Sequence, residues 1–440
     1  MKTSKYNFII NYGAGKLLYN CRTERLAVLD DTLSELFENS SLDIVREKHP
    51  EFYAYLLENK FIVKDDLDET SDLIQEWEKE DNDNRTYSLF INPTMDCNLN
   101  CWYCYEKHIR GSVMNDKIFN SVVSLVRSKI KNTYLKQIHI SFFGGEPLIA
   151  IDSIIVPLLT EVCSLCHAEG KAVSASFITN GTLLTQKNVD NLMKISMDSP
   201  YMFQIALDGN AQYHNKVKRL KNYTNTYELT MRNIKYLLHC EQDVMLRLNM
   251  TKENIDSYTD VITDLHVLSQ KEEEHLTIDF QHVWQDNTGF DDDFLKNQKK
   301  IRQLFQHDGF IVKEMKHIDI SRCYAERENC VTVNYNGDLF KCTAREFSKE
   351  NREGNLLEDG SIVWNGRKEL RDKIKYGNEN CMACKIFPLC HGGCSQFKLE
   401  NQNENDCIRN YSENNKNKIV EDRIEFLLEA YHQKINKKQN

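Results

Sequence analysis

The pattern of apolar and polar positions changes character along the chain. Residues 1–65 alternate short strand-like runs with helical patterns and end on the apolar run at 61–63, which predicts a small winged-helix-like domain. Residues 66–86 are acidic, with apolar positions at Leu73 and Trp77 spaced for one helix face. This segment predicts a linker helix followed by a polar hinge.

From residue 87 onward, strand-like runs alternate with helical patterns. The strands are predicted at 87–94, 137–145, 172–181, 201–209, 243–251 and 276–284, with helices at 116–131, 152–170, 185–196, 226–240 and 255–269. Such repeats indicate a parallel α/β sheet or an open barrel over residues 87–310. The carboxyl ends of parallel strands meet at one edge, and that edge carries the active site.

The last part of the chain has a different composition. Residues 311–415 hold eight cysteines among turn residues, which predicts a module that is held together by metal and has little apolar core. Residues 416–440 place apolar side chains such as Ile424 and Leu428 at helical spacing. They predict a terminal packing helix.

Composition and charge exclude several classes of protein. The hydrophobic fraction of 41% and charged fraction of 28% are ordinary for a globular protein. A net charge of -10 argues against broad binding to nucleic acid. The first residues lack a signal-peptide core, and apolar runs such as 154–159 are too short to span a bilayer. We therefore expect a cytoplasmic protein without a membrane segment.

The 15 cysteines are unevenly distributed. In a reducing compartment, such a number indicates metal or cluster ligands more than disulfides. Cys97, Cys101 and Cys104 follow the first predicted core strand with C-x3-C-x2-C spacing. If they hold three corners of a four-iron cluster, the fourth iron stays open for a small molecule. The alternative is a zinc site completed by a ligand such as His108, or three structural thiols.

The run CNLNCWYC, with aromatic Tyr103 before its third cysteine, resembles the signature of radical S-adenosylmethionine (SAM) enzymes. GGEP at 144–147, TNG at 179–181 and QIALDG at 204–209 match that family's next strand ends in order, although each alone is a common turn. The resemblance implies a partial (β/α)6 TIM-like barrel and a [4Fe-4S] cluster whose open iron binds SAM. It also implies reductive cleavage of SAM to methionine and a 5'-deoxyadenosyl radical.

The same resemblance implies which residues contact SAM. Gly144 and Gly145 let the backbone approach the ligand, and Glu146 accepts from its ammonium group. The other implied contacts are Tyr103, Asn180, Gln204 and Asp208 near the nucleoside and Arg219 at the carboxylate. Ala206 stands where relatives often have serine, so we expect one ribose contact to be absent.

The later cysteines resemble the SPASM extension of radical SAM enzymes, which carries two auxiliary [4Fe-4S] clusters and would bring the total to three. The family's crossed ligation implies Cys323, Cys330, Cys342 and Cys394 for one cluster and Cys381, Cys384, Cys390 and Cys407 for the other. Spacing alone leaves this partition open, and two zinc ribbons are the alternative. Four thiols each leave no open corner, which suits electron transfer. The remaining Cys21, Cys163, Cys166 and Cys240 are predicted to be packing or surface thiols.

SPASM enzymes act largely on peptides, so the resemblance implies a maturase of ribosomally made precursor peptides that forms thioether or carbon-carbon crosslinks. The N-terminal domain is then expected to capture a leader peptide by strand addition, and a flavodoxin or ferredoxin is expected to supply electrons. The alternative is an anaerobic sulfatase-maturating, formylglycine-generating enzyme. Those enzymes usually carry aspartate after the G-x4-C cysteine, where this chain has Thr343. An alternative of another class is a non-catalytic iron-sulfur sensor or scaffold.

One assay separates an enzyme from a scaffold. Anaerobically reconstituted protein with dithionite and SAM is expected to release 5'-deoxyadenosine, measured by liquid chromatography. Intact clusters without 5'-deoxyadenosine would contradict the enzyme hypothesis.

Overall fold

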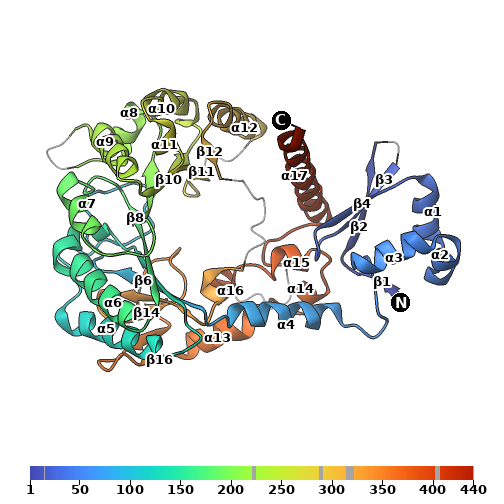
Figure 1. Ribbon diagram of the computed structural model, residues 1–440, viewed down its shortest axis with the longest axis horizontal. Coiled ribbons are helices and arrows are strands. Elements are labelled where there is room, and N and C mark those ends of the chain that lie inside the picture. The colour runs from blue at the N-terminus through green and yellow to red at the C-terminus, as the bar shows by residue number, and fades with distance from the viewer. Residues whose placement is uncertain (14, 221–223, 287–290, 314–321, 402–406, 440) are drawn as a thin grey trace. The chain divides into compact units, whose positions relative to one another are not determined.

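A computed structural model of the protein describes residues 1–13, 15–220, 224–286, 291–313, 322–401 and 407–439 (Figure 1). The chain forms two compact units. The terminal unit contains Met1–Asn82, Lys316–Glu326 and Glu369–Asn440, and the core unit contains Asp83–Met315 and Arg327–Lys368. The domain boundaries predicted from the sequence, at 65, 86, 310 and 415, stay predictions.

The core unit is built on one large sheet with the strand order β12-β11-β10-β9-β8-β7-β6-β13-β14-β15-β16. The first seven of these are β12 (Ile311–Val312), β11 (Leu276–His282), β10 (Asp243–Met250), β9 (Met202–Leu207), β8 (Ala172–Thr179), β7 (Gln137–Phe142) and β6 (Thr86–Asn92). Each pairs in parallel with its neighbour. The six strands predicted from the sequence are therefore confirmed, in a parallel sheet.

Four further strands extend this sheet beyond β6. They are β13 (Cys330–Asn334), β14 (Asp338–Phe340), β15 (Gly354–Leu356) and β16 (Ile362–Trp364). β13 pairs in parallel with β6, and the other three follow antiparallel. Val331, Val333 and Leu339 are buried in the same hydrophobic core as the parallel strands. The expectation of little apolar core in the cysteine-rich region is therefore wrong for residues 327–368.

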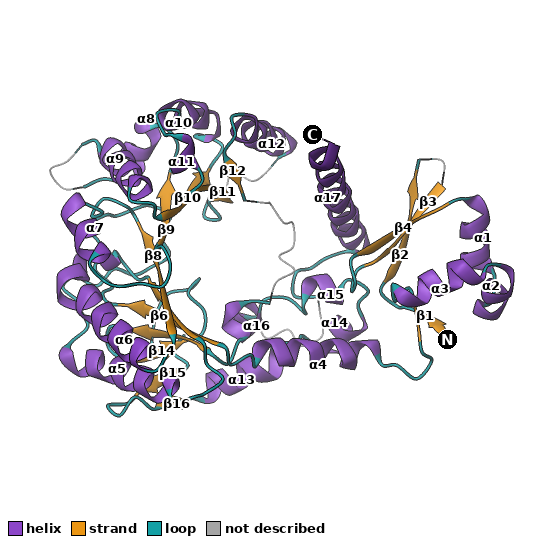
Figure 2. Ribbon diagram, in the orientation of Figure 1, coloured by secondary structure: helices purple, strands orange, loops and turns teal. Residues whose placement is uncertain are grey.

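Alternation along each strand separates an apolar face from a polar one. On β7, Ile138, Ile140 and Phe142 are fully buried in the main core, while His139 and Ser141 point to the opposite face. Helices cover the apolar face (Figure 2). These are α5 (Asp116–Ile130), α6 (Val156–Ala168), α7 (Gln186–Met193), α8 (Ala211–Val217), α9 (Thr226–His239), α10 (Tyr258–Leu265), α11 (Gln270–Glu273) and α12 (Asp292–His307).

One helical run after β7 is unusually apolar. The short helices η1 (Pro147–Ala150) and η2 (Ile151–Ile155) lead directly into α6, and the run is long and apolar enough to cross a membrane. The apolar run at 154–159, which alone is too short to span a bilayer, therefore lies inside a longer helical run. Half of the apolar window is buried, and Ile155, Leu158 and Leu159 pack into the main core. The run thus packs as a core helix of the unit.

The terminal unit begins with an antiparallel sheet of β2 (Asn7–Tyr12), β3 (Gly15–Asn20) and β4 (Arg25–Leu29), in the order β2-β3-β4. β1 (Lys2–Thr3) pairs with β5 (Ile62–Val63). From the central strand β3, Leu18 packs against helices α1 (Asp31–Asn39), α2 (Leu42–Lys48) and α3 (Pro50–Glu58). Leu17 and Tyr19 point the other way, so both faces of this small sheet are covered.

The second face of that sheet packs against helices from the N-terminal and the C-terminal stretches of the unit. These are α4 (Glu69–Asp81), α14 (Glu379–Ala383), α15 (Phe387–Cys390) and α17 (Glu413–Gln439). The cysteine-rich region also contains α13 (Gly366–Ile374) and α16 (Ser395–Glu400). The rings of Trp77 and Phe387 have centroids 5.0 Å apart. The helix predicted in the acidic linker therefore forms, and it is packed along one side.

A buried ion pair fixes the end of α4. Asp81 accepts two hydrogen bonds from Arg322, and its Oδ2 lies 3.4 Å from Lys375 Nζ. The Arg322 guanidinium lies 5.1 Å from the ring of Trp77 and 5.2 Å from that of Tyr376. Because Asp81 is fully buried at its side chain, the two cations depend on it for charge compensation.

Asp81→Ala is expected to lower the free energy of unfolding of the terminal unit by about 3–5 kcal/mol, because it leaves Arg322 buried without its carboxylate. Asp43→Ala is the matched control: Asp43 pairs with exposed Arg46 in the same unit, and its loss is expected to cost less than about 1 kcal/mol. Urea unfolding measured by tryptophan fluorescence tests this, since Trp77 is the tryptophan of the terminal unit. Equal effects would contradict the assignment.

Candidate active site

The three cysteines of CNLNCWYC lie in the loop between β6 and α5. This cysteine loop, residues 93–115, is closed at its base because Met114 N donates to Pro93 O at 2.8 Å and Ile109 N donates to Met95 O at 2.9 Å. The loop therefore projects from the carboxyl end of a central strand, which is the edge where parallel sheets bind ligands.

Gly144 and Gly145 hold the cysteine loop against the end of β7. Gly145 N donates to Thr94 O at 3.2 Å, and Glu146 N donates to Asp96 O at 2.8 Å. A Cβ on Gly145 would lie 2.2 Å from Asp96 O, and Gly144 has a φ of +107°. A side chain at either glycine would push the loop away from the sheet.

Glu146 is fully buried, and its carboxylate joins two strand ends. Oε1 accepts from Leu148 N at 3.1 Å and from the Thr179 hydroxyl at 2.8 Å, and Oε2 accepts from Asn180 N at 2.8 Å. Burial raises the pKa of Glu146 against the effect of these bonds. A carboxylate oxygen accepts two hydrogen bonds, so Oε2 has capacity for a second donor such as an ammonium group. The predicted contact with SAM stays a prediction.

Asn180 also holds the cysteine loop. Its Nδ2 donates to Asn98 Oδ1 at 2.8 Å, and Asn98 Nδ2 donates to Thr182 Oγ1 at 2.9 Å. Asn98 immediately follows Cys97, so the end of β8 positions the first thiol. Its predicted contact with the nucleoside stays a prediction.

Tyr103 joins the cysteine loop to the ends of β9 and β10. Its hydroxyl donates to Asp208 Oδ1 at 2.7 Å, accepts from Asn249 Nδ2 at 2.9 Å and lies 3.4 Å from Lys218 Nζ. Lys218 Nζ lies 3.7 Å from Asp208 Oδ2. Two predicted site residues, Tyr103 and Asp208, therefore meet two that sequence reasoning missed, Lys218 and Asn249.

Charge is concentrated in this group although it is buried. Burial alone lowers the pKa of Lys218, but Cys101, Tyr103 and Asp208 together raise it above its ordinary value, so the amine is charged. Among the described residues, Asp208 Oδ2 and His214 Nε2 have no hydrogen-bond partner. Buried polar atoms left without partners are what a polar ligand satisfies when it binds.

Arg219 lies outside this buried group. It is exposed, and its Nε donates to Lys216 O at 2.9 Å. Its neighbour Lys218 is the cation that points toward Asp208. In HNKVKR, which ends at Arg219, periodicity alone does not show which cation is buried, because Lys218 and Arg219 follow the end of α8 at Val217. The predicted pairing of Arg219 with the SAM carboxylate stays a prediction, and Lys218 is now a competing candidate. Gln204 is half-buried on β9.

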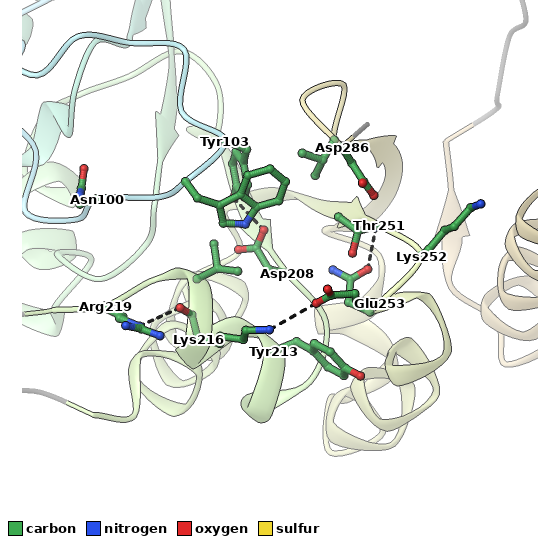
Figure 3. A pocket seen from close by; sticks show the side chains of 14 residues that line it. Asn100, Tyr103, Asp208, Tyr213, Lys216, Arg219, Thr251, Lys252, Glu253 and Asp286 are labelled. Carbon is green, nitrogen blue, oxygen red and sulfur yellow. Dashed lines mark hydrogen bonds and ion pairs between the residues drawn. The ribbon is translucent and has the colours of Figure 1, made fainter. Parts of the chain in front are cut away.

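A pocket of about 580 Å³ opens beside the group (Figure 3). Its wall combines the rings of Trp102, Tyr103 and Tyr213 with charged side chains of both signs, among them Asp208 and Lys252. SAM carries an aromatic base, hydroxyls, an ammonium and a carboxylate. Rings with charges of both signs therefore suit it.

The three thiols differ in exposure: Cys97 is buried, Cys101 is half-buried and Cys104 is exposed. Burial raises the pKa of the Cys97 thiol to about 12. His108 Nε2 lies 3.6 Å from Cys104 Sγ, but within the described parts of the chain no three His, Cys, Asp or Glu side chains converge on one ion. Each cysteine of a four-iron cluster binds a separate iron, so the thiols of a cluster need not converge on one ion.

Four of the later cysteines line one small cavity in the terminal unit. This thiol cavity has a volume of about 70 Å³ and is lined by Cys381, Cys384, Cys390 and Cys407, with apolar wall residues including Ile386 and Phe387. Thiols around an apolar hollow fit an iron-sulfur cluster. They are the same four that the resemblance assigned to one auxiliary cluster.

The loop between Cys390 and Cys394 requires glycine at two of its positions, 392 and 393. His391, Gly392 and Gly393 follow one another with φ of 53°, 72° and 83°, and a Cβ on Gly392 would lie 2.3 Å from Tyr376 O. The other four predicted ligands divide between the units: exposed Cys323 and Cys394 belong to the terminal unit, and Cys330 and Cys342 belong to the core unit. Their grouping stays a prediction.

The remaining cysteines are packing thiols, as predicted. Cys163 and Cys166 are buried in the main core, and the Cys163 thiol donates to the sulfur of Met197 at 3.5 Å. Cys21 is buried in the terminal unit, and Cys240 is half-buried.

Residues 91–265 match the family model of the radical SAM superfamily. The chain carries a radical SAM domain. The matched range runs from the end of β6 to the end of α10, so it contains the cysteine loop, Glu146, Tyr103 and Asp208.

Similar proteins agree with this result. Radical SAM cyclopropyl synthase TigE of Paramaledivibacter caminithermalis is 22% identical over 330 residues, which cover 68% of this chain and 65% of TigE. The chain thus spans just under two thirds of TigE. The cysteine-type anaerobic sulfatase-maturating enzyme of Clostridium perfringens is 22% identical over 362 residues, which cover 74% of this chain and 92% of the enzyme.

Solved structures of Streptococcus suis SuiB share the fold. SuiB bound to S-adenosylmethionine gives a TM-score of 0.51 at 15% identity, covering 91% of this chain and 97% of SuiB. SuiB bound to precursor peptide SuiA gives 0.50 at 14% identity, covering 92% and 99%. The core unit therefore has a radical SAM α/β fold with a large parallel sheet, and the domain implies a [4Fe-4S] cluster and SAM.

Lys218→Met is expected to weaken SAM binding by about 10- to 100-fold, because a buried charge-assisted hydrogen bond contributes about 1.5–3 kcal/mol. Arg219→Met tests the competing assignment, because Arg219 lines the pocket; if Lys218 is the contact, this change alters the dissociation constant by less than about twofold. Equilibrium dialysis of SAM against reconstituted protein measures both. A larger loss with Arg219→Met would restore the original assignment of Arg219.

Proposed function

We propose that the protein is a radical SAM peptide maturase, which abstracts hydrogen from a precursor peptide and forms a thioether or carbon-carbon crosslink in it. The observation that carries this proposal is the edge strand β2, which borders a groove of about 1250 Å³ in the terminal unit. An edge strand binds an extended peptide by strand addition. Residues 1–65 are then a winged-helix-like leader-recognition domain.

The similar proteins support this proposal. SuiB has been solved with a precursor peptide, and TigE is a radical SAM synthase. A peptide substrate, a flavodoxin or ferredoxin as electron donor and a cytoplasmic location belong to the same proposal.

When bound, SAM and the reduced cluster supply a 5'-deoxyadenosyl radical. The residues of this chain contribute by holding the cysteine loop and the bound SAM in position. Gly144 and Gly145 fix the cysteine loop, Glu146 holds the ends of β7 and β8 together, and the buried pair of Asp208 and Lys218 offers both signs of charge to SAM.

Residues 311–415 would form the SPASM domain, with one auxiliary cluster on the four thiols of the thiol cavity. The second auxiliary cluster, on Cys323, Cys330, Cys342 and Cys394, would complete the three clusters. Such fully ligated clusters suit electron transfer from the substrate.

Trp284 is the better candidate for contact with substrate at the end of β11. It is 55% exposed, and its ring lies 5.8 Å from that of Tyr105 and 5.5 Å from the guanidinium of Arg345. His282, the other polar or aromatic candidate there, has its Nε2 2.8 Å from Gln298 Nε2 on α12.

The second candidate function is formylglycine formation, because the sulfatase-maturating enzyme matches most of this chain. Thr343 occupies the position of the expected aspartate. It is 9% exposed, and its carbonyl accepts from the Tyr105 hydroxyl at 2.9 Å. A threonine hydroxyl is too weak a base to deprotonate a serine or cysteine at neutral pH, so this function ranks second.

A search for a short open reading frame beside the gene, followed by co-expression of the peptide it encodes, tests the proposal. The peptide is expected to lose the mass of two hydrogens per crosslink, measured by mass spectrometry, and the Cys101→Ala protein is expected to leave it unmodified. The proposal is falsified if the protein instead converts a sulfatase-type peptide to formylglycine, or releases 5'-deoxyadenosine while the adjacent peptide stays unmodified.

A further inference from the structure

The groove beside β2 and the thiol cavity have a common wall within the terminal unit. Four residues line both of them: Asn380, Cys384, Ile386 and Lys416. Cys384 is among the four thiols assigned to an auxiliary cluster. Whatever fills the groove is therefore separated from the cluster site by a single layer of side chains.

The groove follows the open edge of the small sheet. Within the described part of the chain, β2 pairs with β3 on one side only, and Asn7, Phe8 and Ile9 of β2 line the groove. In an antiparallel pair, alternate residues of an edge strand direct their N–H and C=O groups away from the partner. The groove thus offers an extended peptide a row of backbone hydrogen bonds.

The charge in the groove favours an acidic peptide. Its two acidic side chains are already compensated, because Glu38 pairs with Lys16 and Glu413 pairs with Lys416, both at 2.6 Å. Among the described residues neither Lys5 nor Lys385 forms an ion pair with a carboxylate, and both line the groove. The Lys385 ammonium lies 5.8 Å from the centre of the Phe8 ring.

Residues next to β2 and β3 are also hydrogen-bonded directly to the segment that carries Cys384. Lys5 Nζ donates to Met382 O at 3.0 Å, and the Cys21 thiol donates to Lys385 O at 3.0 Å. These bonds fix the backbone on both sides of Cys384. A peptide that paired with β2 would act on this segment through contacts that already exist.

We propose that an extended acidic peptide segment binds along β2 and that its binding shifts the reduction potential of the auxiliary cluster held by Cys384. The proposal rests on the proposed function, since the natural occupant is a precursor leader. Carboxylates placed near Lys385, which follows Cys384 in the chain, disfavour the reduced cluster, which carries one more negative charge. Exclusion of water from the common wall acts in the same direction. The potential therefore moves to a more negative value.

Two synthetic peptides of ten residues test the proposal. One alternates glutamate with valine, and its twin has lysine in place of glutamate. The protein is reconstituted as full-length Cys97→Ala/Cys101→Ala/Cys104→Ala, so that electron paramagnetic resonance reports auxiliary clusters alone. We expect the glutamate peptide to bind about tenfold more tightly by fluorescence anisotropy. In a redox titration it lowers the midpoint potential, and the lysine peptide does not.

Lys385→Glu is expected to reverse the preference between the peptides, and Lys299→Glu on α12 is the control with the same change in net charge. Binding of the glutamate peptide without a change in potential would overturn the coupling. Equal binding of the two peptides, or binding of neither, would overturn the docking site. This comparison is made on protein that has no substitution in the groove. Neither result decides the maturase function, which the mass of the co-expressed peptide tests separately.

Discussion

The backbone attachment of the cysteine loop to the end of β7 is the constraint on which the site depends. Gly145 and Glu146 donate to Thr94 and Asp96 over one short stretch, and the close approach leaves no room for a Cβ on Gly145. Once the loop is fixed there, the side chain of Tyr103 reaches the ends of two further strands. The positions of the other contacts in the site depend on this backbone pairing.

The parallel sheet explains how distant segments reach one edge. Neighbouring parallel strands place their carboxyl ends side by side, so Glu146, Asn180, Asp208 and Asn249 gather around one loop although about a hundred residues of sequence separate the first from the last. Asn180 N donates to Glu146, and Asn249 donates to Asp208 and to the Tyr103 hydroxyl, whereas the buried Asp208 Oδ2 has no hydrogen-bond partner among the described residues. That atom lies beside Lys218, where the charged ends of a bound SAM would complete the site.

The terminal unit follows a different principle. Its three-stranded sheet is too small to form a core alone, and it is buried on both faces by helices from distant parts of the sequence. The same packing brings the edge strand β2 to the Cys384 segment. The proposed recognition surface and the proposed cluster site thus share one small hydrophobic core, and this shared core is the physical reason for the proposed coupling between them.

The sequence by itself determined the elements whose signals are local. The alternation of apolar residues predicted six of the eleven strands of the large sheet, and the spacing of Cys97, Cys101 and Cys104 indicated a cluster with one open corner, because period and spacing depend on neighbours in the chain. Tertiary structure decided the rest. Tertiary contacts bury Lys218 rather than Arg219, and they pair β13 with β6. Burial and strand pairing depend on contacts between residues far apart in sequence, and these contacts cannot be read from local patterns.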